Sequence, residues 1–305
     1  MTPQSGVSLA PHTSLRVGGA ADFFLLAGSA EELAQGLQWA RARTLPVRVI
    51  GGGSNLLAAD AGVHGLVIKA VNAQWAVHDL TVTADAGVTI ANLARRLAKQ
   101  GYGGLEWAAN VPGTVGGACV NNAGAFGGDT ATCLARATVV DANGRLQHVE
   151  GPDLRYAYRT SVLKRRELGD LAVVSVELRL QQSTPAEADG RVKEFNAQRM
   201  RSQPRISSAG SVFANPSGDY SGRLIEEAGL KGTTVGGAQI SEQHANFIVN
   251  LGGATAADVY ALMCFAQKRV FERSGVWLRP EIELFGRWSA EQMQAMQGEQ
   301  AAAHG

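Results

Sequence analysis

Glycine clustered in three segments is the feature that most restricts how this chain can fold. The 305 residues include 37 glycines, well above the ~7% of an average chain. Of these, 21 lie within residues 51–53, 101–128 and 210–253. They follow no Gly-x-y period, so a collagen-like triple helix is excluded. Because glycine adopts backbone conformations closed to other residues, we expect these segments to form tight turns or backbone-lined binding sites.

The overall composition predicts a folded chain of about two domains. The sequence is 45% apolar, and its 28 basic and 27 acidic residues leave a net charge of +1. That balance favours a buried core over disorder. It also argues against a nucleic-acid partner, because phosphate binding needs clustered lysine and arginine.

Neither a membrane span nor a secreted fold is expected. The longest uncharged stretch, residues 107–128, contains six glycines and Pro112, so we interpret it as a loop region outside a membrane. Residues 1–6 lack a secretory signal. The three cysteines, 119, 133 and 264, are scattered, which predicts a reducing cytoplasm, no disulfide framework and no metal site.

Hydrophobic periodicity and turn signals predict strands and helices in no regular βαβ order, which indicates the α+β class. A hairpin is expected where Ala-Asn-Gly separates residues 137–141 from 146–149, and Ser29 is the expected N-cap of the first helix. The expected strands are 21–27, 47–50, 66–69, 80–84, 137–141, 146–149, 171–180, 211–214, 245–249 and 278–285. The expected helices are 31–43, 90–100, 190–201, 220–228 and 256–271.

A polar, proline-containing segment at 181–189 is the expected domain boundary, because the composition changes there. We predict an N-terminal domain over residues 1–185. A C-terminal domain would cover 186–288. Residues 289–305 are expected to form a flexible tail.

The first glycine cluster directly follows an expected strand and reads Gly51, Gly52, Gly53, Ser54, Asn55, Leu56. Successive glycines let backbone N–H groups converge into a nest that suits a phosphate or pyrophosphate. A tight turn between strands explains three glycines equally well. The cluster is not the dinucleotide fingerprint, because Leu56 stands at its third glycine and no acid follows about twenty residues later. No P-loop motif occurs either.

The second cluster combines a proline turn with nearly bare backbone. Its candidate binding residues are Pro112, Gly113, Thr114, Gly116, Gly117, Asn121 and Gly124. A flat ligand could lie against the glycines, and the amides of Asn121 and Asn122 can both donate and accept hydrogen bonds at a heterocycle edge. The alternative is a plain loop, but loops of this length are usually functional or disordered.

Together these two clusters resemble the flavin-binding half of the vanillyl-alcohol-oxidase/PCMH superfamily. The chain more specifically resembles the family of UDP-N-acetylenolpyruvoylglucosamine reductases, in the shorter subtype without an extra tyrosine-bearing loop. The resemblance keeps its order from about residue 12 to 286. Further matching segments are residues 12–19, 158–161, 209–216, 224–232, 236–241 and 244–248.

The resemblance implies a bipartite PCMH-type FAD-binding domain over 1–185, with subdomains of about 1–70 and 71–185. It also implies an α+β domain for the UDP-sugar over 186–288. FAD would be bound tightly but not covalently by the two clusters, and NADPH would be the hydride source. The implied reaction reduces UDP-N-acetylglucosamine-enolpyruvate to UDP-N-acetylmuramate during peptidoglycan precursor synthesis. The implied protein is a cytoplasmic monomer acting on small molecules, without a nucleic acid or a membrane as partner.

Three catalytic residues are implied by matching motifs. Ser211, in Gly-Ser-Val-Phe-x-Asn-Pro, matches the general acid, although a lone serine after glycine is more often a turn hydroxyl. Arg159, in Tyr-Arg-x-Ser, matches the active-site arginine, although its basic surroundings alone suggest a solvated surface. Glu281 matches the final catalytic acid. Periodicity alone cannot separate it from Glu283 on the same side of a strand, and the Pro-Glu match selects Glu281.

Tyr158, Asn215 and Lys231 match substrate-side positions, whereas Ala214 departs from the long residue usual in the family. Two alternatives stay open: a superfamily oxidase that uses oxygen on a small alcohol or amine, and a flavin- or nucleotide-sugar-binding module without catalysis. No GxSxG elbow occurs, so a hydrolase nucleophile is not expected.

Overall fold

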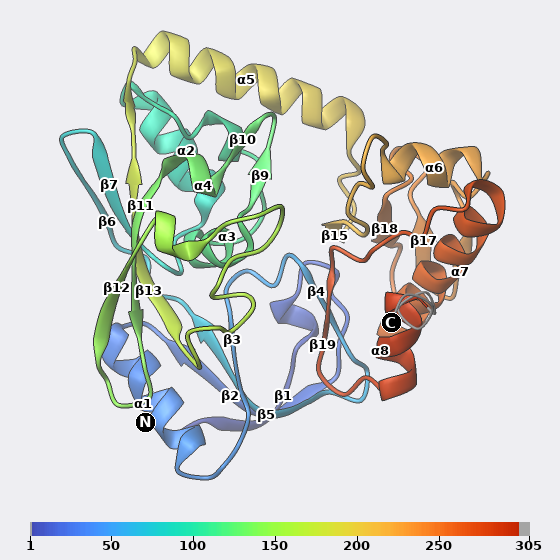
Figure 1. Ribbon diagram of the computed structural model, residues 1–305, viewed down its shortest axis with the longest axis horizontal. Helices are drawn as coiled ribbons and strands as arrows, with labels where there is room; N and C mark the ends of the chain where they lie inside the picture. Colours follow the sequence, from blue (N-terminus) through green and yellow to red (C-terminus); the bar gives the residue numbers. More distant parts are fainter. Residues whose placement is uncertain (1, 299–305) are drawn as a thin grey trace. The chain divides into compact units, whose positions relative to one another are not determined.

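The computed structural model describes residues 2–298 and divides the chain into two compact, interleaved units (Figure 1). Unit 1 comprises residues 1–5, 23–52 and 65–199. Unit 2 comprises residues 6–22, 53–64 and 200–305. Each unit has its own hydrophobic core, and both contain helices and strands, so the α+β class is confirmed.

The largest sheet of unit 1 is antiparallel and five-stranded, in the order β12-β11-β13-β7-β6. Its strands are β6 (Trp75–His78), β7 (Thr81–Asp85), β11 (Leu134–Val140), β12 (Leu146–Glu150) and β13 (Ala172–Arg179). Val140 pairs with Leu146, which confirms the predicted Ala-Asn-Gly hairpin. The alternation of buried and exposed residues along β7 fits a sheet with one face in the core.

A second sheet has the order β1-β2-β5-β3, with β3 parallel to β5. The strands are β1 (Gln4–Ser8), β2 (Ala20–Ala27), β3 (Val47–Ile50) and β5 (Val63–Ala70). Helix α1 (Ala30–Arg41) connects β2 to β3, and the Ser29 side chain accepts a hydrogen bond from the Glu32 N–H. The predicted N-cap is therefore confirmed.

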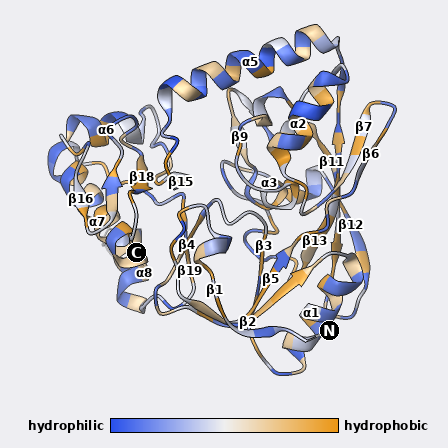
Figure 2. Ribbon diagram, turned by 180° about the vertical axis from the view of Figure 1, so that it is seen from behind, coloured by the Kyte–Doolittle hydropathy of each residue, from blue (hydrophilic) through white to orange (hydrophobic). Residues whose placement is uncertain are grey.

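The remaining elements of unit 1 are short, apart from α2 and α5. They are β8 (Tyr102–Gly103), β9 (Gly124–Ala125), β10 (Gly128–Asp129), β14 (Gln181–Gln182), α2 (Ile90–Lys99), α3 (Val115–Asn121), α4 (Thr130–Cys133) and α5 (Pro185–Ser202). Helix α2 buries six of its ten residues, as its apolar periodicity predicts. Helix α5 buries only Ala188 and Val192 and is largely hydrophilic (Figure 2).

Unit 2 is built on an antiparallel sheet in the order β15-β18-β17-β16. The strands are β15 (Ser208–Ser211), β16 (Thr234–Val235), β17 (Ala238–Ile240) and β18 (Phe247–Asn250). Helices α6 (Ser221–Glu227) and α7 (Ala256–Ser274) contribute Leu224, Val259 and Leu262 to the core. Strand β4 (Leu56–Ala58) pairs in parallel with β19 (Glu283–Phe285).

Four predictions about local structure need correction. The expected strand 211–214 lies earlier, over Ser208–Ser211. Residues 107–128 are not entirely loop, since α3 occupies Val115–Asn121. The expected helix 190–201 begins at Pro185, which the first turn of a helix tolerates because that N–H has no partner in the helix. The expected strand 278–285 is a strand only over Glu283–Phe285, because Pro280 lacks the N–H that a ladder requires.

The predicted tail 289–305 contains helix α8 (Ala290–Gln297). This helix begins with a capping box formed by Ser289 and Gln292. Residues 299–305 lie outside the described residues. The two compact units are defined by contacts within the chain and not by what each binds. The limits at 185 and 288 of the expected ligand-binding domains therefore stay a prediction. Within residues 2–298, no helix combines the length and apolarity needed to cross a bilayer.

Candidate flavin-binding loops and active-site residues

The two glycine clusters meet in unit 1, where neither leaves room for a side chain. A Cβ atom at Gly51 would lie 2.1 Å from the Thr114 Oγ1 atom, and one at Gly52 would lie 2.9 Å from the Gly113 Cα atom. The Gly113 backbone has φ +107°, a conformation that favours glycine. Glycine at these positions therefore lets two segments about sixty residues apart form one surface of bare main chain.

Helix α3 begins in the second cluster because Thr114 caps it. The Thr114 Oγ1 atom accepts a hydrogen bond from the Gly117 N–H at 3.3 Å. Gly116 packs against the protein, since a Cβ there would lie 2.7 Å from the Ala86 Cβ atom. A Cβ at Gly117 would meet only the Thr114 Oγ1 atom, at 3.6 Å. The structure thus gives Gly116 a packing role and leaves the backbone of Gly117 accessible.

Two amide groups near these loops have unused hydrogen-bonding capacity. The Asn121 Nδ2 group donates to the Gly117 carbonyl at 3.0 Å, but its Oδ1 atom is buried without a hydrogen-bond partner among the described residues. The Asn110 Nδ2 group is in the same state. Buried polar atoms are nearly always satisfied, so both atoms are suited to a bound ligand. The residues present therefore fit a flat, hydrogen-bonding group such as FAD.

The rest of the first cluster belongs to unit 2 and is tied to the N-terminal motif. Gly53 has φ +61°, and a Cβ there would lie 2.1 Å from the His12 carbonyl oxygen. The Ser14 N–H donates to the Gly53 carbonyl at 3.0 Å. Ser54 is half-buried in the turn before β4, which begins at Leu56. Residues 12–14 therefore determine the path of this loop.

Arg159 is held beside the C-terminal end of α3. Its Nη2 group donates to the Gly124 carbonyl at 3.0 Å and its Nη1 group to the Asn122 carbonyl at 3.4 Å. Its guanidinium carbon lies 5.1 Å from the centre of the Tyr158 ring, and Tyr158 is 55% exposed. Arg159 has φ +57°, and such strain in a non-glycine residue is concentrated at functional sites.

Two buried polar residues support this arginine, and one of them corrects a prediction, because the Asn122 amide bonds within the protein and not to a heterocycle edge. The Ser161 Oγ group, fully buried, donates to the Val120 carbonyl at 2.6 Å. The buried Asn122 amide donates to the Ala157 carbonyl at 3.2 Å and accepts from the Ala131 N–H at 2.9 Å. The Arg159 loop is therefore fixed to α3 from both sides. The Tyr-Arg-x-Ser motif contains Ser161, so that residue could have been found from the sequence.

Ser211 and Glu281 are brought together in unit 2 on neighbouring backbone segments. Ser211 ends β15 opposite Phe247, after a register irregularity at Gly210, which has φ +76°. The carbonyl of Val212, the next residue, accepts hydrogen bonds from the Glu281 N–H at 2.8 Å and the Ile282 N–H at 3.3 Å. The chain carrying Glu281 thus runs directly beside the chain carrying Ser211.

Asn246 fixes the Ser211 segment from its other side and was not found by sequence reasoning. Its Oδ1 atom accepts from the Phe213 N–H at 2.9 Å, and its Nδ2 group donates to the Phe213 carbonyl at 2.8 Å. Its own carbonyl accepts from the Val212 N–H at 2.9 Å. Asn246 is only 3% exposed, so these bonds form in the core.

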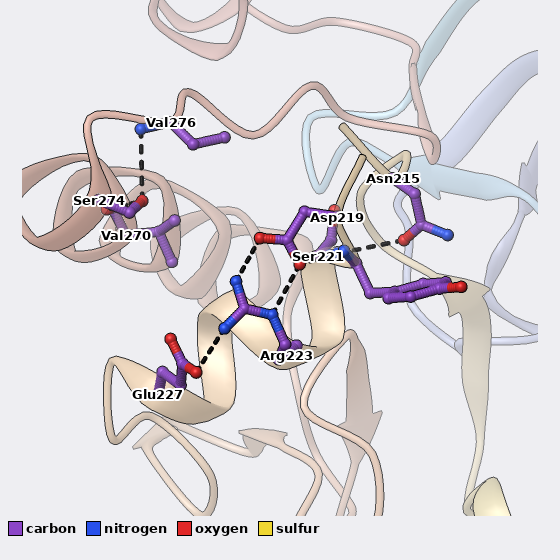
Figure 3. Close-up of polar contacts among 9 residues, drawn as sticks. Asn215, Asp219, Ser221, Arg223, Glu227, Val270, Ser274 and Val276 are labelled. Atoms are coloured by element: carbon purple, nitrogen blue, oxygen red, sulfur yellow. Dashed lines mark hydrogen bonds and ion pairs between the residues drawn. The ribbon is translucent and has the colours of Figure 1, made fainter. Parts of the chain in front are cut away.

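Asn215 and Lys231 contact opposite ends of α6. The Asn215 Oδ1 atom accepts a hydrogen bond from the Ser221 N–H at 3.1 Å (Figure 3). The Lys231 ammonium lies 2.7 Å from Glu226. The structure therefore places these two predicted substrate contacts at opposite ends of α6, and Asp219, just before the helix, pairs with Arg223 within it (Figure 3).

The two buried cysteines of unit 1 offer no rival nucleophile. Burial raises the pKa of the Cys119 thiol to about 11 and that of Cys133 to about 12, so neither is a thiolate nucleophile near neutral pH. Burial lowers the pKa of His244, next to Lys231. Among residues 2–298, no three histidine, cysteine or acidic side chains are grouped so that they could hold a metal ion.

Two family models match separate parts of the chain. A family model described as an FAD binding domain matches residues 21–150. Another, described as the C-terminal domain of UDP-N-acetylenolpyruvoylglucosamine reductase, matches residues 202–285.

Relatives match nearly the whole chain. The UDP-N-acetylenolpyruvoylglucosamine reductase of Synechococcus sp. (strain JA-3-3Ab) is 43% identical over 287 residues, covering 93% of this chain and 91% of its own. The enzyme of Anoxybacillus flavithermus is 39% identical, covering 94% and 95%. The crystal structure of the Thermus caldophilus reductase superposes with a TM-score of 0.80 at 37% identity, covering 93% of this chain and 99% of that one.

Proposed function

The chain belongs to the family of UDP-N-acetylenolpyruvoylglucosamine reductases, and from that premise we propose how its own residues carry out the reaction. It is an FAD-dependent oxidoreductase that reduces the enolpyruvyl group of UDP-N-acetylglucosamine-enolpyruvate in peptidoglycan precursor synthesis. The chemistry that FAD supplies when bound is hydride transfer, from NADPH to the enolpyruvyl double bond. The observation that carries the proposal is the 2.8 Å bond from the Glu281 N–H to the carbonyl of Val212, beside Ser211.

The bare main chain at Gly51, Gly52 and Gly113 would hold the FAD, together with the backbone of Gly117 and the Asn121 amide. Support comes from the absence of room for any Cβ at Gly51 and Gly52. The buried, unsatisfied Oδ1 atom of Asn121 would accept a hydrogen bond from the cofactor. These residues bind and orient, and they take no part in proton transfer.

Ser211 would supply the proton. Hydride adds to the β-carbon of the enolpyruvyl group, leaving negative charge at the α-carbon that is delocalised into the adjacent carboxylate. A proton must then bond to the α-carbon, and the Ser211 Oγ–H would donate it. A serine hydroxyl is a weak acid, but this carbon is so basic that a correctly placed weak donor is sufficient.

Arg159 and Glu281 would stabilise the charge that develops before the proton arrives. A guanidinium can hold a carboxylate through two hydrogen bonds and offset its growing charge. The bonds from Arg159 to two main-chain carbonyls support this role, because they fix the side chain in advance. Glu281, in its protonated form, would donate a hydrogen bond to the enolate oxygens.

Tyr158, Asn215 and Lys231 would contact the UDP-sugar. The ammonium of Lys231 suits a phosphate group, and its contact with Glu226 would have to be shared or exchanged on binding. We further propose a monomer in the cytoplasm, with NADPH and a UDP-sugar as substrates and with a role in cell-wall growth and division. These assignments follow from membership of the family.

An anaerobic absorbance experiment tests the proposal. NADPH should bleach the flavin band of the holoenzyme, and UDP-N-acetylglucosamine-enolpyruvate should restore it. If oxygen restores the band while this substrate does not, the chain is an oxidase. If NADPH produces no bleaching at all, a binding module without catalysis is the better description.

A further inference from the structure

We propose that Asn55 is a positioning residue for Glu281, so that the loop expected to bind FAD also determines where the catalytic acid lies. This inference rests on the role proposed above for Glu281. It changes the expectation from the sequence, which assigns Asn55 to the cofactor alone.

The contact that carries the proposal joins two residues 226 positions apart. The Asn55 Nδ2 group donates a hydrogen bond to the Glu281 main-chain carbonyl at 3.1 Å. The carbonyl of Asn55 accepts a hydrogen bond from the Glu283 N–H at 2.9 Å. Asn55 therefore holds the acid-bearing segment at two points, both on its main chain.

On its other side, the segment that carries Glu281 is bonded to Val212, the residue after Ser211. The Glu281 N–H donates to the Val212 carbonyl at 2.8 Å. Both backbone groups of Glu281 are thus engaged, the N–H towards the general acid and the carbonyl towards Asn55. Removing the Asn55 amide leaves the Glu281 main-chain carbonyl without this hydrogen bond. The backbone that carries the Glu281 side chain is then held only through its N–H.

The need for asparagine follows from where the strands begin. The parallel pairing of β4 and β19 starts at Leu56 and Glu283, so no ladder bond of that pair serves the Glu281 carbonyl. A side-chain amide can donate where the main chain does not reach. Aspartate in its ionised form has no hydrogen to donate, so it cannot replace the asparagine in this role.

The loop that carries Asn55 is itself fixed. The Ser14 N–H holds the Gly53 carbonyl at 3.0 Å, and the His12 carbonyl occupies the space where a Gly53 side chain would be. Anything that stabilises residues 53–55, including a bound flavin, therefore also stabilises the backbone of Glu281. This continuity gives the cofactor loop a second function in the reduction of the substrate.

A double-mutant cycle on the holoenzyme tests the proposal, with Asn55→Ala, Glu281→Gln and the double variant. The two half-reactions are followed separately by stopped-flow absorbance, together with the FAD dissociation constant and the melting temperature. Asn55→Ala should slow reoxidation by UDP-N-acetylglucosamine-enolpyruvate about tenfold, which is the scale of one lost hydrogen bond. Flavin reduction by NADPH should change by no more than about twofold.

The decisive readout is the coupling between the two variants. If Asn55 acts through Glu281, the double variant should be no slower than Glu281→Gln alone, whereas independent effects would multiply. Asn55→Asp should be as slow as Asn55→Ala. Asn143→Ala, which removes an exposed turn amide in unit 1, is the matched control and should leave both half-reactions unchanged.

Three results would overturn the inference. One is a multiplicative double variant. Another is a weaker FAD affinity with normal reoxidation at saturating FAD, which would make Asn55 a cofactor contact only. The third is an equal loss in both half-reactions with a lower melting temperature, which indicates a structural role. If Glu281→Gln itself leaves reoxidation unchanged, the role proposed for Glu281 fails first and the inference fails with it.

Discussion

Replacing Asn246 with alanine should destabilise unit 2 strongly, because this side chain satisfies both backbone groups of Phe213. Its Oδ1 atom accepts from the Phe213 N–H at 2.9 Å and its Nδ2 group donates to the Phe213 carbonyl at 2.8 Å. Both residues are buried, with exposed fractions of 3% and 2%. Water therefore cannot take over either hydrogen bond without opening the core.

The expected loss follows from those two groups. A buried donor or acceptor left without a partner costs about 1–3 kcal/mol, so two of them give about 2–6 kcal/mol. That is a large fraction of the ~5–15 kcal/mol that stabilises a typical domain. Asn246→Asp keeps the acceptor and loses only the donor, but it adds a buried charge, so it should not be milder than the loss of one bond.

Urea unfolding followed by tryptophan fluorescence measures the effect, because Trp277 and Trp288 both lie in unit 2. Asn143→Ala is the control, since its side chain bonds to Arg41 and Asp141 at an exposed turn, and it should cost less than about 1 kcal/mol. A loss for Asn246→Ala as small as that of the control would refute the reasoning. It would mean that the Phe213 backbone finds other partners.

Two further perturbations test the glycine surface and the effect of burying His244 in unit 2. Gly51→Ala would place a Cβ 2.1 Å from the Thr114 Oγ1 atom, so the purified variant should retain much less flavin absorbance per mole of protein. The control is Gly190→Ala on α5, where a Cβ would meet no other atom within 4 Å. This variant should retain the full flavin absorbance, and a loss there would contradict the steric explanation for Gly51. Burial lowers the pKa of His244 below its ordinary value of about 6.5, so the unfolded state binds more protons below that pH. The unfolding free energy should therefore fall as the pH drops from about 6.5 through the folded pKa. His244→Gln should make the pH dependence of the unfolding free energy shallower. If it does not, groups other than His244 cause the loss of stability at low pH.

Much of the local structure could be predicted from the sequence because it depends on local signals. The hairpin at 142–144 and the N-cap at Ser29 are both confirmed. Helix α3 was missed because a seven-residue segment with two glycines has neither apolar periodicity nor high helix propensity. It forms where Thr114 caps it and Gly116 packs on Ala86, and both conditions depend on the tertiary structure.

The interleaving of the two units could not be predicted for a related reason. Strand β4 pairs with β19, more than two hundred residues later, and no local pattern shows such a pairing. The same holds for Asn246, whose partner Phe213 lies 33 residues away. The structure also separates Glu281 from Glu283 by their neighbours, since Glu283 pairs in the β4 ladder and Glu281 lies beside Val212, but the choice of Glu281 as the catalytic acid stays a prediction from the Pro-Glu match.

The proposed role of Ser211 is to protonate the substrate, with no part in taking hydride from NADPH. Anaerobic stopped-flow measurement of Ser211→Ala tests it most directly, because the two half-reactions are observed separately. NADPH should bleach the flavin of this variant at a rate within about threefold of the wild type. Reoxidation by UDP-N-acetylglucosamine-enolpyruvate should slow by about 10²–10⁴-fold, the range of a lost general acid. Equal losses in both half-reactions, or reoxidation at the wild-type rate, would contradict it.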